Sequence, residues 1–232
     1  MQPKTLRDAR NRREWTETQA AQRLGMSQSY LAMLESGQRR VTPSLARKFK
    51  AVYGLSPTAL PSPDLFSPRV DVSGEEFASM VSALGYPGFA YMKSRTRERN
   101  PAEVLLEALK QDNLEPRVVE ALPWLLLHYW DMDQAWLVSQ AKLNNLQNRL
   151  GFVVALARRM SESSTPPNPA RTETLAELEA KLDKSRLVKQ DTLGKPPQTA
   201  TEREWVMQNR TPEAEHWNVM TDLRPEHFQY VP

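Results

Sequence analysis

The sequence predicts an all-α protein. Only 8 of its 232 residues are Gly, whereas apolar residues make up 40% and Leu and Ala are abundant. This composition argues against sandwiches, barrels and Gly-rich phosphate loops, which need many turn glycines. The longest apolar run, residues 122–130, is less than half of the ~20 residues that a membrane helix needs. We therefore expect a soluble, mainly helical protein of the bacterial cytosol that contacts no membrane.

Charge is unevenly distributed along the chain. Residues 1–60 hold eleven Lys or Arg against four Asp or Glu, whereas the remainder holds 20 against 24. A basic front and a mildly acidic rear point to an N-terminal module that binds a polyanion.

Four helices and a final turn are predicted within the first 60 residues. Gly25 and Gly54 are suited to end the second and fourth helices, because Gly tolerates positive φ. Only "GMS" separates the second helix from the third, and a turn of this length that begins with Gly is typical of a helix-turn-helix. The predicted helices cover residues 4–14, 16–25, 27–36 and 43–54, with the turn at "SPTAL".

The third helix, in "SQSYLAMLESGQRR", carries polar side chains at its tip. A recognition helix enters the major groove with its first turn toward the bases. Gln28 can pair with adenine through two hydrogen bonds, Ser29 can bond several base edges, and Met33 offers an apolar contact to a thymine methyl. We therefore expect these three residues to read bases. The side chains expected to bind phosphates are those of Gln19, Ser27, Arg39 and Arg40.

The same stretch resembles a known family. "TETQAAQRLGMSQSYLAMLESGQRRVTPSLARKFKAVYGLS" is similar to the Xre/lambda-repressor-like helix-turn-helix family in its Gln-Ala-Ala, Leu-Gly, Ser-Gln-Ser-Tyr-Leu, Leu-Glu-x-Gly and Pro-x-Leu-Ala elements. The resemblance implies a five-helix DNA-binding domain, with phosphate contacts near Gln19 and base readout from Gln28, Ser29 and Met33. Many members carry a polar residue at the position of Met33, so direct readout is expected to be thinner here.

A proline-rich stretch separates this module from the rest. "SPTALPSPDLFSPRV" holds four prolines in fifteen residues, which favours extended structure. We predict a DNA-binding domain over residues 1–60, a linker over 61–72, and a larger helical domain over 73–232 with a mobile break near 161–170.

The longest predicted helix runs from about residue 133 to 160 and carries apolar residues at 3–4 spacing. Such a stripe is either a coiled-coil seam between two chains or the core-facing side of a central helix, which is the commoner case and the one we favour. The aromatic residues of the C-terminal tail either pack back on the domain or dock on a partner. If a partner or dimer interface is formed, it is expected at Trp136, Leu143, Leu146, Leu150, Val153, Trp217, Phe228 and Tyr230.

The rear domain shows no catalytic or metal-binding motif. There is no P-loop, HExxH or GxSxG, and no Cys. His128 and His216 have no second pair of ligands at metal-binding spacing. The expectation is a protein that is not an enzyme and that holds no cofactor and no metal.

The rear domain also resembles a known class. "EALPWLLLHY" and "AKLNNLQNRLGFVVALA" are similar to helical domains of antitoxin regulators that stand beside nucleotidyltransferase-type toxins. That resemblance implies a regulator that binds its own operator and neutralises a cognate toxin through the helical domain.

Two functions follow. The leading hypothesis is a sequence-specific, homodimeric repressor that binds a double-stranded DNA operator, is nucleoid-associated when bound, and acts as an autoregulating antitoxin. The alternative is a free-standing, ligand-sensing transcriptional regulator with an apolar pocket in its C-terminal domain. That pocket would be lined by Trp124, Tyr129, Trp130 and Trp136.

Overall fold

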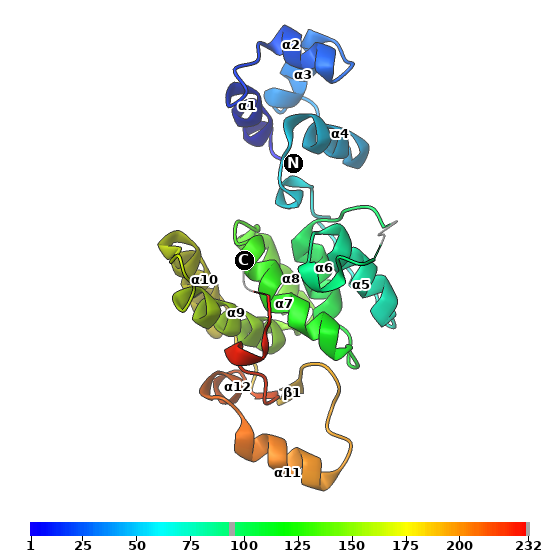
Figure 1. The fold of residues 1–232 in the computed structure, drawn as a ribbon. Helices are drawn as coiled ribbons and strands as arrows, with labels where there is room; N and C mark the ends of the chain where they lie inside the picture. The colour runs from blue at the N-terminus through cyan, green and yellow to red at the C-terminus, as the bar shows by residue number, and fades with distance from the viewer. Residues whose placement is uncertain (93–95, 231–232) are drawn as a thin grey trace. The chain divides into compact units, whose positions relative to one another are not determined.

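The computed structural model describes residues 1–92 and 96–230. The chain divides into two compact units, Met1–Pro63 and Asp64–Pro232, which are described separately (Figure 1). The described residues form twelve α-helices and a single pair of two-residue strands, so the all-α prediction is confirmed. None of the helices in the described part of the chain is long and apolar enough to span a membrane.

The front unit contains four α-helices and one 3₁₀ turn. The fifth helix implied by the family resemblance is this three-residue turn. The fully buried apolar side chains of the front unit come from all four helices and include Leu6, Leu31, Phe49 and Tyr53. The elements are α1 (Pro3–Asn11), α2 (Glu17–Arg23), α3 (Gln28–Glu35), α4 (Pro43–Tyr53) and η1 (Pro57–Ala59).

Side-chain caps define where three of these helices begin. The hydroxyl oxygens of Thr16, Ser27 and Thr42 each accept a hydrogen bond from a backbone N–H in the first turn of the helix that follows. At the other end, Gly54 adopts φ +52 and ends α4, as predicted.

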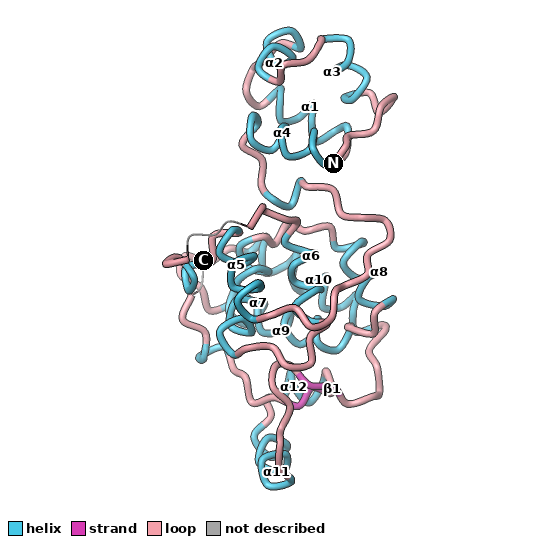
Figure 2. The backbone as a smooth tube through the Cα atoms, turned by 90° about the vertical axis from the view of Figure 1, so that its right-hand side faces the viewer, coloured by secondary structure: helices cyan, strands magenta, loops and turns pink. Residues whose placement is uncertain are grey.

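The rear unit is a helical body from which helix α11 (Ala200–Asn209) extends (Figure 2). Two-residue strands pair in parallel, with Asp191 opposite Val219 and Thr192 opposite Met220. The elements are α5 (Gly74–Ala83), η2 (Pro87–Phe89), α6 (Pro101–Leu109), α7 (Pro116–His128), α8 (Gln134–Leu143), α9 (Gln147–Glu162), α10 (Pro169–Asp183), β1 (Asp191–Thr192), α11 (Ala200–Asn209), α12 (Pro212–His216), β2 (Val219–Met220) and η3 (Pro225–His227).

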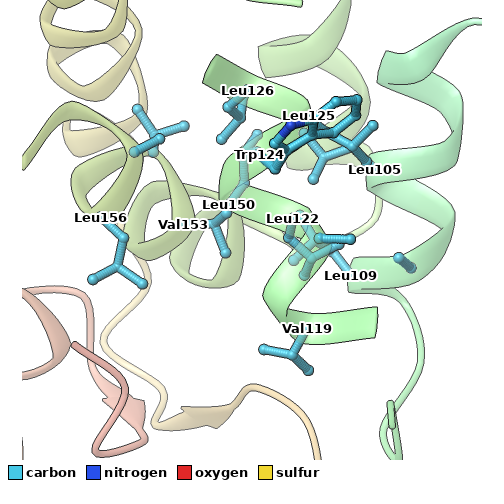
Figure 3. Close-up of a cluster of buried hydrophobic side chains, with 14 of the residues drawn as sticks. Leu105, Leu109, Val119, Leu122, Trp124, Leu125, Leu126, Leu150, Val153 and Leu156 are labelled. Atoms are coloured by element: carbon cyan, nitrogen blue, oxygen red, sulfur yellow. The ribbon is translucent and has the colours of Figure 1, made fainter. Parts of the chain in front are cut away.

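The core of the rear unit lies where α6, α7 and α9 meet. Figure 3 shows Leu105 and Leu109 of α6, Leu122 and Leu125 of α7, and Leu150 of α9 gathered in one cluster. Nearly every residue of α7 between Val118 and Leu127 is buried, as its uniformly apolar sequence predicts.

The prediction of one long helix over residues 133–160 is wrong. The chain turns at Asn144 and Asn145, and Asn145 adopts φ +57, a left-handed conformation that Asn tolerates better than most residues. The segment therefore forms two helices, α8 and α9. Asp133 caps α8 through a 3.0 Å hydrogen bond from the Trp136 N–H.

The eight residues predicted to form a partner interface differ in exposure. Five of them are buried in the core of their own chain and are not available to a partner. Trp136 and Tyr230 are partly buried against that core, and Leu143 is 71% exposed. The apolar stripe is split between two helices, so it does not form the continuous coiled-coil seam that was the alternative, and its buried residues face the core, as the favoured interpretation expected. The five buried residues are Leu146, Leu150, Val153, Trp217 and Phe228.

Two boundaries also differ from the predicted ones. Ser161 and Glu162 still belong to α9, and α10 begins at Pro169, so the break covers only residues 163–168. The division between the units falls after Pro63, and residues from Phe66 onward pack on the rear unit.

Candidate nucleic-acid interface

The front unit contains two short helices joined by a tight turn. Gly25 in this turn has φ +56, and the Met26 N–H donates to the Ala21 carbonyl at 3.0 Å. The Ser27 hydroxyl then accepts from the Tyr30 N–H at 3.2 Å and starts α3. The helix-turn-helix geometry predicted from "GMS" is therefore present.

An ion pair joins α3 to α1. Arg10 donates from Nε and Nη2 to the two carboxylate oxygens of Glu35, each at 2.8 Å. Glu35 is only 4% exposed. Hydrogen bonding to this carboxylate raises the pKa of Arg10. The Arg10 Nη1 also donates to the Trp15 carbonyl at 3.0 Å, so one guanidinium ties together α1, the segment before α2 and the end of α3.

The tip of α3 is exposed, and its leading side chain is oriented by α2. The Thr18 hydroxyl donates to Gln28 Oε1 at 3.2 Å, and Gln28 Nε2 donates to Glu17 Oε2 at 3.3 Å. Both ends of the Gln28 amide therefore have a partner on α2, while the side chain stays exposed at the surface. An amide oriented in this way is suited to pairing with adenine, which needs a donor and an acceptor side by side.

The other two expected base readers differ in accessibility. Ser29 is exposed beside Gln28, whereas Met33 is half-buried one turn later. The Met33 carbonyl accepts the Ser36 hydroxyl at 3.2 Å and the Arg39 N–H at 3.1 Å. Met33 thus helps to organise the loop that follows α3, and only part of its side chain is available to a ligand.

Gln19 and Ser27, both expected to bind phosphate, also cap helices. Gln19 Oε1 accepts from the Thr16 N–H at 3.0 Å, while the Gln19 N–H donates to Thr16 Oγ1 at 3.2 Å. This reciprocal arrangement is a capping box. It occupies the acceptor of the Gln19 amide and leaves its NH₂ group as the end suited to phosphate. Ser27 likewise accepts with its oxygen and keeps its hydroxyl proton for donation.

Arg39 and Arg40 lie in the exposed loop between α3 and α4. Gly37, with φ +80, turns the chain at the end of α3. This turn brings the Arg39 N–H back to the Met33 carbonyl, so the loop returns toward the recognition helix. Two exposed guanidinium groups beside such a helix are suited to phosphates.

Sequence reasoning missed Glu17 and Thr18. Gln28 lies ten residues after Thr18 and eleven after Glu17. No local pattern predicts a contact at this separation, because it depends on how α2 crosses α3. Sequence reasoning also missed Trp15, which makes two cation–π contacts. The guanidinium carbon of Arg23 lies 4.3 Å from the centroid of the Trp15 ring, and that of Arg13 lies 5.6 Å from it.

Comparison with known proteins agrees with this geometry. A family model described as a helix-turn-helix domain matches residues 4–62. No curated protein and no solved structure matches the chain. The front unit is thus a helix-turn-helix domain, which indicates a DNA-binding regulator.

The rear unit offers a cavity different from the predicted one. A cavity of about 750 Å³ lies beside the break between α9 and α10, and residues of its wall include Ser163, Pro166, Arg171 and Glu226. None of the four aromatic residues predicted to line a pocket lies in the wall of this cavity, and Trp124 and Tyr129 belong to the packed core. Within the described residues, no group of three or more His, Asp or Glu side chains is arranged to hold a metal ion.

Proposed function

We propose that this protein is a sequence-specific transcriptional repressor of the Xre type. It places α3 in the major groove of its operator. In that pose Gln28 and Ser29 bond base edges, and the exposed part of Met33 contacts a thymine methyl. Gln19, Ser27, Arg39 and Arg40 bind the flanking phosphates.

The observation that supports this proposal most strongly is the presentation of Gln28. Its amide is exposed at the tip of α3 and is held by Thr18 and Glu17. A solvated Gln would have to lose side-chain entropy on binding, whereas a held Gln has already lost part of it. A binding surface requires an exposed polar group to be held in place, whereas a purely structural bundle has no such requirement.

We also propose that the repressor binds DNA as a homodimer. One unit presents two polar base readers and one partly buried Met, which is a small set for specific binding. Two units on half-sites about one helical turn (~34–36 Å) apart would double these contacts. The rear unit is the part of the chain available to hold two copies together.

The direct test is footprinting on the DNA upstream of the gene itself. We expect a protected site with two related halves, whose protection decreases as salt increases. Protection that is identical on unrelated DNA would contradict sequence-specific repression. The absence of any protection would contradict DNA binding.

For the rear unit we propose the antitoxin role. One support is that the sequences of α7 and α8–α9 resemble helical domains of antitoxin regulators. A second is the exposure of the apolar side chains of Leu143, Val188 and Trp205, which suit a protein contact. The test is affinity purification of the tagged chain from cells that carry the neighbouring genes. A stoichiometric neighbour that is toxic when expressed alone is expected, and a homodimer without a companion would contradict the proposal.

One observation favours the alternative of a ligand-sensing regulator. The cavity near Ser163 and Arg171 is large enough for a small molecule. Its wall places four prolines and Met160 beside hydroxyl groups, Arg171 and Glu226, so the ligand would combine an apolar body with a polar or charged group. A thermal-shift screen with small amphipathic molecules tests this, and a ligand that raises the melting temperature and changes operator affinity would favour the alternative.

A further inference from the structure

Residues 66–72, which we call the strap, follow the front unit along the chain. The sequence places them in the linker, yet they are held against three helices of the rear unit. At the start of the strap, the Phe66 ring meets the Trp136 ring of α8 edge-on, with centroids 5.3 Å apart. Two residues later, Pro68 is buried.

Ion pairs of Arg69 hold the middle of the strap. Arg69 donates from Nε to Glu107 of α6, a carboxylate that is 2% exposed, and lies 2.7 Å from Glu76 of α5 through Nη1. Arg99 also pairs with Glu107. The buried carboxylate therefore has two cations. Arg69 is the half-exposed one, and it connects the strap to both α5 and α6.

Hydrogen bonds between the Gln111 side chain and the strap backbone hold residues 69–72. Gln111 Nε2 donates to the Arg69 carbonyl at 2.7 Å, and Gln111 Oε1 accepts from the Val72 N–H at 3.2 Å. Gln111 is itself 9% exposed and donates to the Glu107 carbonyl at 2.9 Å. A buried amide that bonds two backbone groups of the strap acts like a strand partner, and it leaves the strap little freedom.

These contacts shorten the tether between the two units. Because the front unit ends at Pro63, only residues 64 and 65 lie between it and Phe66, the first anchored side chain of the strap. An extended chain spans at most about 3.3 Å per residue, so this tether reaches about 7 Å. If the strap were released, residues 64–72 would reach about 30 Å by the same rise per residue.

We propose that the strap is a clamp that sets the reach of the DNA-binding unit. Closed, it limits the tether to residues 64–65 and so limits how far apart two DNA-binding units of a dimer can lie. Released, it adds seven residues and relaxes that spacing. The consequence for DNA rests on the proposed function, whereas the clamp itself does not.

The test measures reach without DNA. The chain has no Cys, so Arg47→Cys and Lys142→Cys, both at exposed positions, give one spin label on each unit. Distance distributions are compared in four versions of this labelled chain. These are the parent, a release variant (Phe66→Ala with Arg69→Ala), a control at the 63% exposed Val70 (Val70→Ala), and a version with seven Gly/Ser residues inserted after Asp64.

The release variant is chosen so that the rear unit still folds. Glu107 keeps Arg99 as a partner, and neither substituted side chain is fully buried. Amide exchange supplies the second readout. The Val72 N–H is expected to be protected in the parent and to exchange at least ten-fold faster in the release variant, with the protection of α6 and α9 unchanged.

The expected result is that the release and insertion variants broaden the distance distribution equally, by about 2-fold from the square-root dependence on tether length, while Val70→Ala leaves it unchanged. A release variant that matches the parent in distance or in Val72 exchange overturns the proposal. An insertion variant that matches the parent also overturns it, because tether length would then not govern reach.

A second arm uses operator DNA with half-sites moved apart by 5 and 10 base pairs. The parent is expected to lose at least ten-fold in affinity on the altered spacings, and the release variant less than three-fold. Equal losses in both overturn the clamp's role in spacing. If the parent binds no DNA at all, the proposed function fails, while the distance measurement still decides whether the clamp exists.

Discussion

The Arg10 guanidinium and the Glu35 carboxylate form two hydrogen bonds of 2.8 Å each, and this pair joins α1 to the last turn of α3. Both residues lie on the front unit, which has only 63 residues and therefore a small core. The orientation of the recognition helix thus depends on one buried ion pair as well as on apolar packing.

Replacing Arg10 by Met is expected to destabilise the front unit by about 3–5 kcal/mol, because Glu35 is left buried without its main partner. Urea denaturation followed by circular dichroism measures this loss. Arg7→Met is the control, since Arg7 bonds the Glu35 backbone carbonyl, at 3.1 Å, and not the carboxylate, so its loss should cost about 1 kcal/mol. Equal losses in the two variants would show that the carboxylate does not depend on Arg10.

Replacing Gln28 by Ala should weaken operator binding by about 1–3 kcal/mol, roughly 5- to 150-fold, and relax the preference at one base pair. The physical reason is the loss of a paired donor and acceptor at the tip of α3. Gel-shift titration against operators mutated at single positions measures both effects. Gln22→Ala, at an exposed position on α2, should leave binding unchanged. An unaltered base preference in Gln28→Ala would remove this residue from the reading set.

Replacing Arg39 and Arg40 together by Ala should weaken binding to every DNA sequence alike. Each lost phosphate contact releases about 0.9 fewer counterions, so the slope of log affinity against log salt should fall by about 2. Fluorescence anisotropy over a range of salt concentrations measures the slope. The control removes the same charge from the rear unit at the exposed Lys184 and Lys195. If both double variants change the slope equally, only net charge matters.

Replacing Gly151 by Ala tests the packing of the rear core. Ala is normally favoured over Gly inside a helix by about 1 kcal/mol. Here the added methyl would lie 2.3 Å from the Trp217 ring, which is fully buried, so overpacking should dominate and cost about 1–3 kcal/mol. Thermal denaturation measures the sign. A Trp217→Leu background should reduce the penalty, and a stabilising Gly151→Ala would show that the ring moves without cost.

Much of the front unit could be predicted from local sequence. Thr16, Ser27 and Thr42 cap helices through oxygens three residues before the bonded N–H, and Gly25 and Gly54 adopt the positive φ expected of them. These signals act within a few residues, so helix boundaries and the helix-turn-helix turn follow from the chain directly.

The rear unit shows where local patterns fail. The spacing of apolar residues from Trp136 to Met160 fits one helix, yet Asn145 takes a left-handed conformation and splits it. Periodicity records which residues avoid water and does not record a single residue that reverses the chain. The same limit explains why Leu150 and Val153, candidates for a partner surface, are buried in their own core.

The amino-acid sequence alone determined the class of the front unit, the residues at the tip of α3, and the all-α character of the rest, because capping, helical periodicity and turn chemistry are local properties. Only the tertiary structure decided that Glu17 and Thr18 hold Gln28, that Arg10 pairs with Glu35, and that residues 66–72 belong to the rear unit. Each of these contacts joins residues ten or more positions apart. Such contacts form only when whole helices pack, since packing, and not local propensity, brings their side chains within hydrogen-bond distance.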